Sequence, residues 1–435
     1  MKDFATSDSP AVQTQLDRLA LLTLPQGRFG LETIRAMLGR LGNPQRALPP
    51  AFHVAGTNGK GSTCAFLRAM LEAEGYKVHA ATKPHLVRYN ERIRIAGRLI
   101  ENDLLAALLK EVLDTSEDLT PSFFEVTTAA TFLAFARFPA DACVIEVGLG
   151  GRFDATNVLD RPAACGIATL GIDHEAFLLA PEVGVPQDPL ARIAFEKASI
   201  AKRGVPMVTQ AYPKIAADAV AEVARQAGAM LVMRGRGWWA EAGETLAYRD
   251  AKGELALPLP ALIGAHQADN AALAVAMLRH QRQIPVSTEA MAQGIRETRW
   301  PARLQLLGDG PLTALVPGRK VWLDGGHNPD AGGAIARHFA DHAPLHLIIG
   351  MLSTKNAAAI VAPLGDRIAS LSIVPAPGHE VHPPEAFAPH SPIPARSFAT
   401  VAEALSALPP EGDVLIAGSL YLAGEVLRLN REFPD

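Results

Sequence analysis

A glycine-rich loop near the start of the chain constrains the fold more than any other stretch. Residues 52–55 form a short apolar run typical of a buried strand, three glycines follow within 56–61, and residues 63–74 are predicted to be helical. The glycines permit positive φ angles and let backbone N–H groups close on an anion. The helix adds the positive end of its dipole, and Lys60 adds a mobile charge. The stretch therefore predicts a strand–loop–helix unit that holds the phosphates of a nucleoside triphosphate.

The spacing in this loop differs from the common G-x-x-x-x-G-K-[ST] pattern. Val54 stands where the first glycine would be, and Gly61 separates Lys60 from the hydroxyl residues Ser62 and Thr63. Either hydroxyl suits a hydrated Mg²⁺ ion. An ordinary glycine-rich turn is the alternative, and the loop does not indicate what happens to the phosphates. The residues expected to bind ATP here are Gly56, Thr57, Asn58, Gly59, Lys60, Gly61, Ser62 and Thr63.

The chain length and the numbers of charged residues indicate a globular protein of more than one domain. A chain of 435 residues exceeds one ordinary core, so two domains are expected. Lysines and arginines number 41 and acidic residues 45, a net charge of −4, which provides no basic field for nucleic acid or a membrane surface. The expected partners are therefore small molecules, and we expect a monomer.

Cysteine usage and hydropathy favour the cytoplasm. Cys64, Cys143 and Cys165 form no C-x-x-C pair, and each lies in an apolar segment, which indicates reduced, buried thiols. The start of the chain lacks the apolar core of a signal peptide, and no apolar run is long enough to span a membrane. We therefore expect a cytoplasmic protein.

Strands and helices alternate along the first two thirds of the chain. Two helices are expected within 11–41, broken at 24–27. Further strands are predicted at 77–81, 142–147 and 163–170, with helices at 102–114 and 122–137 between the first two of them. Such alternation predicts an α/β fold, in which helices cover both faces of a parallel sheet.

Two polar residues near the ends of these strands are candidate ligands. Ligands of parallel sheets collect at the carboxyl ends of the strands, where Gly56, Glu146 and His174 fall. Glu146 ends an apolar strand, the position at which phosphate-loop proteins hold Mg²⁺. Capping a neighbouring helix is the less favoured alternative for this residue. A lone histidine in a loop is usually structural, but the place of His174 beside the Glu146 strand favours a ligand.

Lys197 lies in an unusual position. Asp188 as N-cap, Pro189 as first residue and Gly204 beyond the end frame one predicted helix, and Lys197 falls in the middle of its apolar stripe. Such a lysine either extends its amine to solvent or sits buried with a lowered pKa. A neutral amine reacts with CO₂ to give a carbamate, an oxygen ligand for Mg²⁺. The residues alone favour the solvent-reaching alternative.

A second domain is predicted beyond the Trp300-Pro-Ala302 step, which divides the chain into 1–298 and 299–435. A new α/β pattern follows, with strands at 320–323, 345–349, 371–375 and 413–417 and helices at 330–341 and 398–407. Asp324-Gly-Gly-His-Asn-Pro329 comes after the first strand and is either turn chemistry or a ribose or base contact. Arg303 is placed to reach phosphates.

These stretches together resemble the dihydrofolate synthase/folylpolyglutamate synthase family, a branch of the Mur ligase superfamily. The resemblance covers roughly residues 25–425, and its ordered set of motifs is more specific than any one motif. The matching stretches begin at His53, Pro84, Phe123, Glu146, Asp173, Glu196, His266, Trp300 and Asp324.

The resemblance implies a Mur ligase-type phosphate-loop ATPase domain and a smaller, Rossmann-like carboxyl-terminal domain, with ATP between them. It assigns Ser62 and Glu146 to one Mg²⁺, and Glu146, His174 and a carbamylated Lys197 to a second. The implied catalytic residues are Lys60, Lys197 and His174. The other implied contacts are Asn270, Arg303, Asp324 and His327 for ATP, and Phe124, Asp154 and Arg152 for the pterin or folate.

The implied reaction joins L-glutamate to dihydropteroate and extends reduced folates. A substrate carboxylate attacks the γ-phosphoryl group of ATP to give an acyl phosphate, and the amine of glutamate then displaces phosphate as the amide forms. Charge neutralisation and alignment are what phosphoryl transfer needs, and Lys60, Mg²⁺ and Arg303 would supply them.

The sequence departs from the family pattern in three places. Lys83 replaces the usual serine before Pro-His-Leu, and Ser199 replaces the glycine after Glu-Lys-Ala. The segment from His174 to Lys197 is also longer than usual, with an extra loop at 180–187, and this loop puts the local geometry of the second metal in question.

Two other functions fit parts of the sequence. A cell-wall precursor ligase of the same superfamily would carry a separate nucleotide-sugar domain, for which the roughly 50 residues before the loop are too few. A nucleotide-operated switch would leave the Asp324 domain unexplained. We expect the folate ligase.

Overall fold

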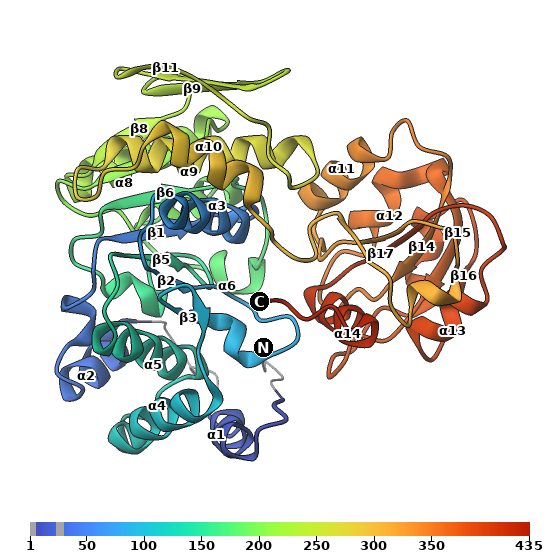
Figure 1. Ribbon diagram of the computed structural model, residues 1–435, viewed down its shortest axis with the longest axis horizontal. Helices are drawn as coiled ribbons and strands as arrows, with labels where there is room; N and C mark the ends of the chain where they lie inside the picture. Colours follow the sequence, from blue (N-terminus) through green and yellow to red (C-terminus); the bar gives the residue numbers. More distant parts are fainter. Residues whose placement is uncertain (1–5, 23–29) are drawn as a thin grey trace. The chain divides into compact units, whose positions relative to one another are not determined.

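The computed structural model describes residues 6–22 and 30–435, which form two compact units (Figure 1). The first unit comprises Met1–Pro84, Arg88–Ala261 and Gln267–Thr298, and the second comprises His85–Val87, Leu262–His266 and Arg299–Asp435. The principal boundary between the two units therefore falls between Thr298 and Arg299. In the described part of the chain, no helix is long and apolar enough to cross a membrane.

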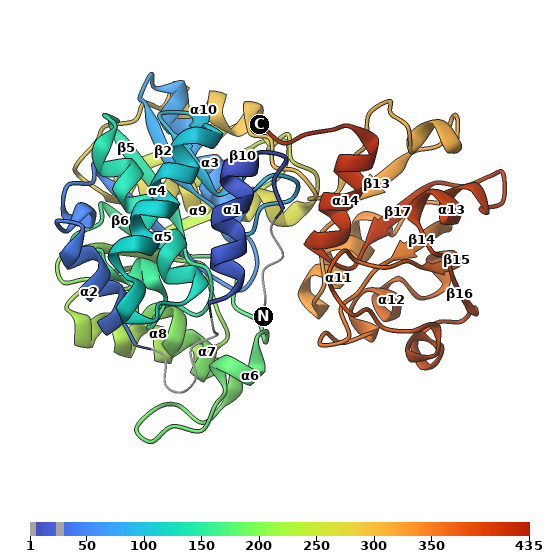
Figure 2. The same cartoon turned by 90° about the horizontal axis from the view of Figure 1, so that it is seen from below.

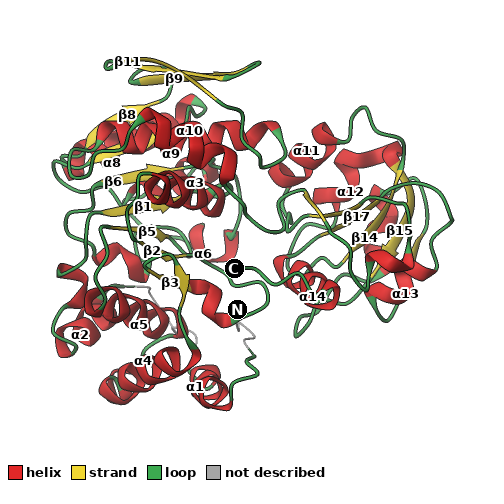
Figure 3. Cartoon of the chain, viewed as in Figure 1, coloured by secondary structure: helices red, strands yellow, loops and turns green. Residues whose placement is uncertain are grey.

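An eight-stranded sheet forms the centre of the first unit, in the order β4-β3-β2-β5-β1-β6-β7-β8 (Figure 3). All neighbours from β2 to β8 are parallel, and β3 and β4 add an antiparallel edge. The inner strands are buried on both faces, which is why they are continuously apolar in sequence. The strands are β1 (Ala51–Ala55), β2 (Val78–Ala81), β3 (Ile93–Ile95), β4 (Arg98–Leu99), β5 (Ala142–Glu146), β6 (Ala164–Ile167), β7 (Pro206–Thr209) and β8 (Met230–Met233).

Helices pack on both sides of this sheet, and the predicted α/β class is confirmed. Four helices, α1, α2, α4 and α5, gather on one side of the sheet (Figure 2). Their apolar side chains share one core with Cys143 and Ile145 of β5. Elsewhere α10 packs on α3, and α7 on α8. The helices are α1 (Pro10–Ala20), α2 (Glu32–Arg40), α3 (Lys60–Ala73), α4 (Asn102–Thr115), α5 (Phe123–Arg137), α6 (Glu175–Leu178), α7 (Pro189–Ala198), α8 (Lys214–Ala227), α9 (Ala265–His280) and α10 (Thr288–Glu297).

Some predicted boundaries are wrong. The helix that carries Lys197 ends at Ala198 and not near Gly204, because the chain turns at Ser199, whose hydroxyl donates to the carbonyl of Phe195 (2.8 Å). Helix α3 begins at Lys60, three residues early, since the last glycines of the loop already form helical hydrogen bonds. The break predicted at 24–27 lies outside the described residues.

A small antiparallel sheet in the order β11-β10-β9 follows β8 and was not predicted. Its strands are β9 (Trp238–Ala242), β10 (Leu246–Asp250) and β11 (Gly253–Leu257). Trp238 and Tyr248 are fully buried and stack with ring centroids 5.9 Å apart. This pair supplies the apolar contact that a short sheet needs in order to pack on the unit.

The second unit contains a six-stranded sheet in the order β12-β13-β17-β14-β15-β16, parallel except for β12. Apolar clusters cover both of its faces. Its strands are β12 (Gln305–Leu306), β13 (Val321–Leu323), β14 (Leu345–Ile349), β15 (Ile368–Ile373), β16 (Ala395–Ser397) and β17 (Val414–Ala417). Its helices are α11 (Pro329–His338), α12 (Ala358–Leu364), α13 (Val401–Ser406) and α14 (Leu420–Asn430).

Candidate active site

The glycine-rich loop joins β1 to α3, and its glycines are required by close packing. Gly56 has φ +151°, and a Cβ there would lie 2.9 Å from the Cβ of Ala168. Gly59 has φ +82°, and a Cβ there would lie 2.3 Å from Oδ1 of Asn270. Asn270 is buried on α9, so this predicted ATP residue stands directly against the loop. Larger residues at either glycine would push the loop out of place.

Backbone contacts fix the loop to the segment after β6. The N–H of Thr57 donates to the carbonyl of Thr169 (2.7 Å), and its hydroxyl donates to the carbonyl of Gly171 (2.9 Å). The N–H of Gly171 lies 3.1 Å from the same hydroxyl. Because β6 neighbours β1 in the sheet, these bonds hold the loop rigid at the carboxyl edge.

Lys60 bends back over the loop, where its Nζ donates to the carbonyls of Gly56 (3.0 Å) and Thr57 (3.1 Å). It is the first residue of α3, so its charge and the free amides of the helix end lie together. Ser62 is buried beside it, and the buried hydroxyl of Thr63 has no hydrogen-bond partner. These positive groups and the spare hydroxyl suit a phosphate.

Glu146 ends β5, the strand next to β1, and is paired in register with Val54. Only 3% of the residue is exposed, and its Oε2 accepts a hydrogen bond from the backbone N–H of Lys83 (3.0 Å). Both the loop and this carboxylate therefore lie at the same edge of the sheet. A buried carboxylate here is stabilised by a nearby cation.

Lys197 lies in the last turn of α7 with 4% of its surface exposed, so the side chain does not reach solvent. Burial, and after it the charge of Lys60, lowers its pKa to about 7, while Asp173 and Asp154 oppose the shift. Much of the amine is therefore neutral near pH 7. A neutral, buried amine is the chemical form that accepts CO₂.

His174 follows β6 by seven residues and caps the short helix α6 with φ +55°. Its Nε2 lies 3.9 Å from Oδ2 of Asp173. Across residues 6–22 and 30–435, no three His, Cys, Asp or Glu side chains gather in a way that would hold a metal. The second metal site predicted from the sequence contains only two residues of these types, His174 and Glu146, so it stays a prediction.

Ser62 and Glu146 fit the first metal better. Mg²⁺ prefers hard oxygen ligands and usually keeps several waters, taking one or two protein groups together with phosphate oxygens. A buried hydroxyl at the start of α3 and a buried carboxylate at the end of β5 are donors of that kind. No second protein carboxylate is needed for such a site.

The loop after β5 carries Asp154 and Arg152. Oδ2 of Asp154 accepts from the N–H groups of Gly148 (2.9 Å) and Leu149 (3.0 Å), and Oδ1 accepts from Thr156 (3.0 Å) at the start of a 3₁₀ helix. A Cβ at Gly148 would lie 3.2 Å from Oδ2 of Asp154 and 3.6 Å from Nζ of Lys83. The lysine that departs from the family pattern thus stands next to this half-buried carboxylate.

Phe124 is the second residue of α5 and is half-buried, its ring in an edge contact with Phe123 at 5.4 Å. A capping box begins this helix, since Glu125 accepts from the N–H of Ser122 (2.8 Å) and Ser122 accepts from that of Glu125 (3.3 Å). Glu125 is therefore occupied in holding the helix end, which leaves the Phe124 ring as the group available for stacking.

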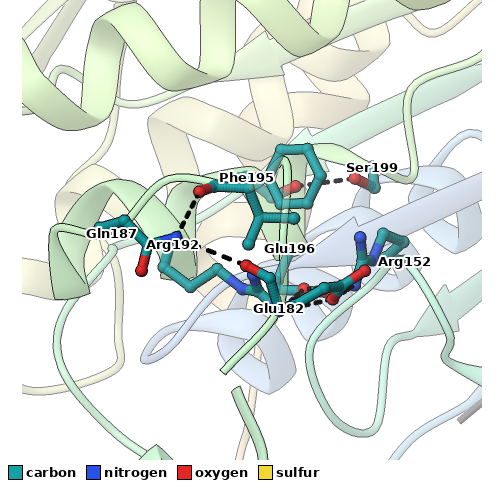
Figure 4. A network of polar contacts seen from close by, with 8 residues as sticks. Arg152, Glu182, Gln187, Arg192, Phe195, Glu196 and Ser199 are labelled. Carbon is teal, nitrogen blue, oxygen red and sulfur yellow. Dashed lines mark hydrogen bonds and ion pairs between the residues drawn. The ribbon is translucent and has the colours of Figure 1, made fainter. Parts of the chain in front are cut away.

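Arg152 pairs with two carboxylates, Glu182 on the extra loop and Glu196 on α7 (Figure 4). Arg192, one turn before Glu196, pairs with the same two. Sequence reasoning missed Glu182 and Arg192 as functional candidates. The one available signal was that the extra loop carries a single acidic residue between its prolines.

In the second unit, the Asp324 motif forms a compact group at the end of β13. Asp324 accepts from the N–H groups of Leu304 (2.8 Å) and Gly326 (2.7 Å), and His327 Nδ1 lies 3.0 Å from the carbonyl of Gly325. Arg303 precedes Leu304, and a Cβ at Gly325 would lie 3.1 Å from its Nη1, so the Arg303 side chain stands beside this group. The Asp324 carboxylate is engaged by backbone, as the turn interpretation expected.

Comparison with known proteins supports one function. No protein-family model matches the sequence. The chain is 32% identical to the dihydrofolate synthase/folylpolyglutamate synthase of Escherichia coli, over 92% of this chain and 91% of the relative. FolC of E. coli solved with DHPP and ADP aligns with a TM-score of 0.83 and 31% identity over 97% of each chain. A bifunctional folylpolyglutamate synthase/dihydrofolate synthase solved with Mn, AMPPNP and L-glutamate aligns with a TM-score of 0.82 and 29% identity, over 98% of this chain and 99% of the other.

Proposed function

The chain belongs to the dihydrofolate synthase/folylpolyglutamate synthase family, and from that premise we propose which of its residues carry the reaction. It is an ATP-dependent ligase that joins L-glutamate to dihydropteroate and adds glutamate to reduced folates. It uses a nucleotide and a divalent metal. The assignment of individual residues is our own and rests on the geometry above.

The reaction proceeds through an acyl phosphate. A carboxylate oxygen of the acceptor attacks the γ-phosphorus of ATP, the bond to the bridging oxygen breaks, and ADP leaves. The amine of glutamate then attacks the acyl carbon, phosphate leaves with the former carboxylate oxygen, and the amine loses a proton as the amide forms. Both steps need negative charge to be neutralised and reactants to be aligned.

One observation carries this assignment. The phosphate loop after β1 and Glu146 at the end of β5 lie at the same carboxyl edge of the sheet, because these two strands are parallel neighbours. Lys60, already folded over its loop at 3.0 and 3.1 Å from two carbonyls, neutralises the phosphates together with the amides of α3. Asn270 supports the loop from α9. We assign Arg303, Asp324 and His327 to ATP as well, because they lie around the end of the parallel strand β13, and such a strand end is the usual place for a ligand.

Ser62 and Glu146 hold Mg²⁺, which supplies charge neutralisation to the phosphate oxygens. This assignment is supported because both residues are buried and offer the oxygen ligands that Mg²⁺ prefers. Lys197, as a carbamate, and His174 serve a second Mg²⁺ with Glu146. The carbamate forms when the neutral Nζ attacks the carbon of CO₂ and loses a proton, and the burial of Lys197 and its pKa of about 7 favour that step.

Phe124, Asp154 and Arg152 hold the pterin or folate. Phe124 offers a half-buried ring for stacking, and Asp154 is a carboxylate fixed by three backbone N–H groups. We place the enzyme in the cytoplasm as a monomer. The three cysteines support the compartment, since all are free and buried.

A coupled ADP-release assay tests the function. Purified protein with ATP, Mg²⁺, L-glutamate and dihydropteroate should release ADP well above a control without the pterin, and tetrahydrofolate should replace dihydropteroate as acceptor. Equal ADP release with and without the acceptors would indicate a nucleotide hydrolase and overturn the proposal.

A further inference from the structure

Four charged side chains meet beside the site just described. Arg152 and Arg192 both direct Nη2 at Oε2 of Glu182, the Arg192 contact at 2.9 Å (Figure 4). Both Nη2 atoms also lie 3.1 Å from Oε1 of Glu196. The group is therefore a neutral quartet of two guanidinium and two carboxylate groups.

The four side chains come from three elements. Arg152 lies on the loop after β5, and Arg192 and Glu196 lie one turn apart on α7. Glu182 lies on the loop between α6 and α7, which protrudes from the first unit in Figure 2. The side chains of Arg192 and Glu196 are 7% and 6% exposed, whereas that of Glu182 is 21% exposed. Glu182 is thus the outermost member of the group.

The two arginines have binding capacity that the quartet does not use. In the four ion pairs above, each arginine contributes a single nitrogen, Nη2, and within the described part of the chain the buried Nε atoms of Arg152 and Arg192 have no hydrogen-bond partner. Guanidinium groups bind carboxylates best through two parallel N–H bonds. Without Glu182, the remaining three groups carry a net charge of +1. The arginine pair therefore suits a further carboxylate.

The loop that carries Glu182 lies at the surface of the first unit. Val183 is 99% exposed, and Gln187 donates to the carbonyl of Val185 (2.8 Å) within the loop itself. A cavity of about 60 Å³ lies between the loop and α7, lined by Glu182, Arg192 and Pro189 among others. Space beside the arginines and an exposed loop mean that Glu182 can leave without unfolding α7.

The arginine pair is continuous with the proposed acceptor site. The N–H of Arg152 donates to the carbonyl of Glu196 (2.8 Å), and a Cβ at Gly151 would lie 2.7 Å from that carbonyl. This packing fixes the loop of Arg152 and Asp154 against the turn that carries Lys197. A carboxylate on the arginines would therefore lie next to residues that we assign to the acceptor and the metal.

We propose that Arg152 and Arg192 form a carboxylate-binding subsite, which Glu182 fills in the substrate-free chain and from which a non-reacting carboxylate of a glutamylated folate displaces it. The proposal rests on the proposed function and deepens it. A reduced folate carries a glutamyl carboxylate that does not react, whereas the only carboxylate of dihydropteroate is the reacting one. Glu182 therefore competes with folates alone and biases the enzyme toward dihydropteroate.

The test compares the two acceptors in Glu182→Gln and Arg192→Gln. Removing the charge of Glu182 should lower the ratio of KM for tetrahydrofolate to KM for dihydropteroate by about tenfold to a hundredfold, the range of one hydrogen bond to a charged group. Arg192→Gln should raise the same ratio. Glu111→Gln, which removes an equally well-paired carboxylate from Arg137 on the far helices, should leave the ratio unchanged.

Amide hydrogen exchange gives a second readout that a structural role would not move. Tetrahydrofolate should speed exchange in residues 180–187, because Glu182 is displaced, and dihydropteroate should not. An unchanged KM ratio in an active Glu182→Gln enzyme overturns the inference, as does an equal rise of both KM values. If the unaltered chain ligates neither acceptor, the proposed function itself is wrong.

Discussion

Lys197 is buried in the last turn of α7, where a charged ammonium is costly and the pKa falls to about 7. Lys197→Ala should abolish most ligase activity, and acetate or another small carboxylate should restore part of it by supplying the missing oxygen ligand. Lys214→Ala, at an exposed lysine of α8, is the control and should keep full activity. An active Lys197→Ala enzyme would show that the lysine is a packing residue only.

His53 lies in the buried strand before the loop, fully enclosed, with its Nε2 2.8 Å from the hydroxyl of Thr156. Burial lowers its pKa to about 3. The unfolded chain, with an ordinary value near 6.5, binds the proton first as pH falls, so stability is present above about pH 6.5 and is lost progressively toward pH 3.

The predicted cost from His53 is about 1.4 kcal/mol of unfolding free energy for each pH unit below about 6. Denaturant unfolding at several pH values measures it. His53→Gln should unfold with a shallower dependence on pH in this range, and an unchanged slope would mean that His53 is charged in the folded chain.

At the scale of elements, the strand–loop–helix unit depends on glycine at position 59. Gly59→Ala combines a strained φ of +82° with a Cβ 2.3 Å from Oδ1 of Asn270, so the loop or α9 must shift. We expect ATP affinity to fall by more than about tenfold, measured by calorimetric titration.

Gly75→Ala is the matched control for this loop. Gly75 also has a positive φ, +96°, but nothing lies within 4 Å of its Cβ position. The Gly75→Ala variant should lose a little stability and keep its ATP affinity. Equal losses of affinity in both variants would place the effect in the backbone of α3 and not in the contact with Asn270.

The elements near the site were largely predictable, because apolar strands, a glycine-rich loop and helix caps are local signals. Asp188 and Pro189 do begin α7, and Ser122 and Glu125 do cap α5. The end of α7 was missed because Gly204 looks like a helix terminator, whereas the chain had already turned at Ser199. The sheet from β9 to β11 has short, mixed strands with exposed faces, so its pattern is weak.

For the whole molecule, the sequence predicted two α/β units and the order of their motifs, but not the contacts between distant residues. Glu182 meets Arg152 across 30 positions, and no periodicity or spacing encodes such a pair. Asp324 was expected to be either a turn residue or a ligand, and only the structure places its carboxylate on the N–H groups of Leu304 and Gly326. The roles of the site residues remain predictions for direct chemical tests.

The central claim is that this chain activates a carboxylate of its acceptor by phosphorylation, and oxygen transfer tests it most directly. Dihydropteroate labelled with ¹⁸O in its carboxylate is incubated with the enzyme, ATP, Mg²⁺ and L-glutamate, and the released phosphate is analysed by mass spectrometry. Because an acyl phosphate expels its carboxylate oxygen with the phosphate, each phosphate should carry one ¹⁸O. Unlabelled phosphate accompanying amide formation would contradict the account.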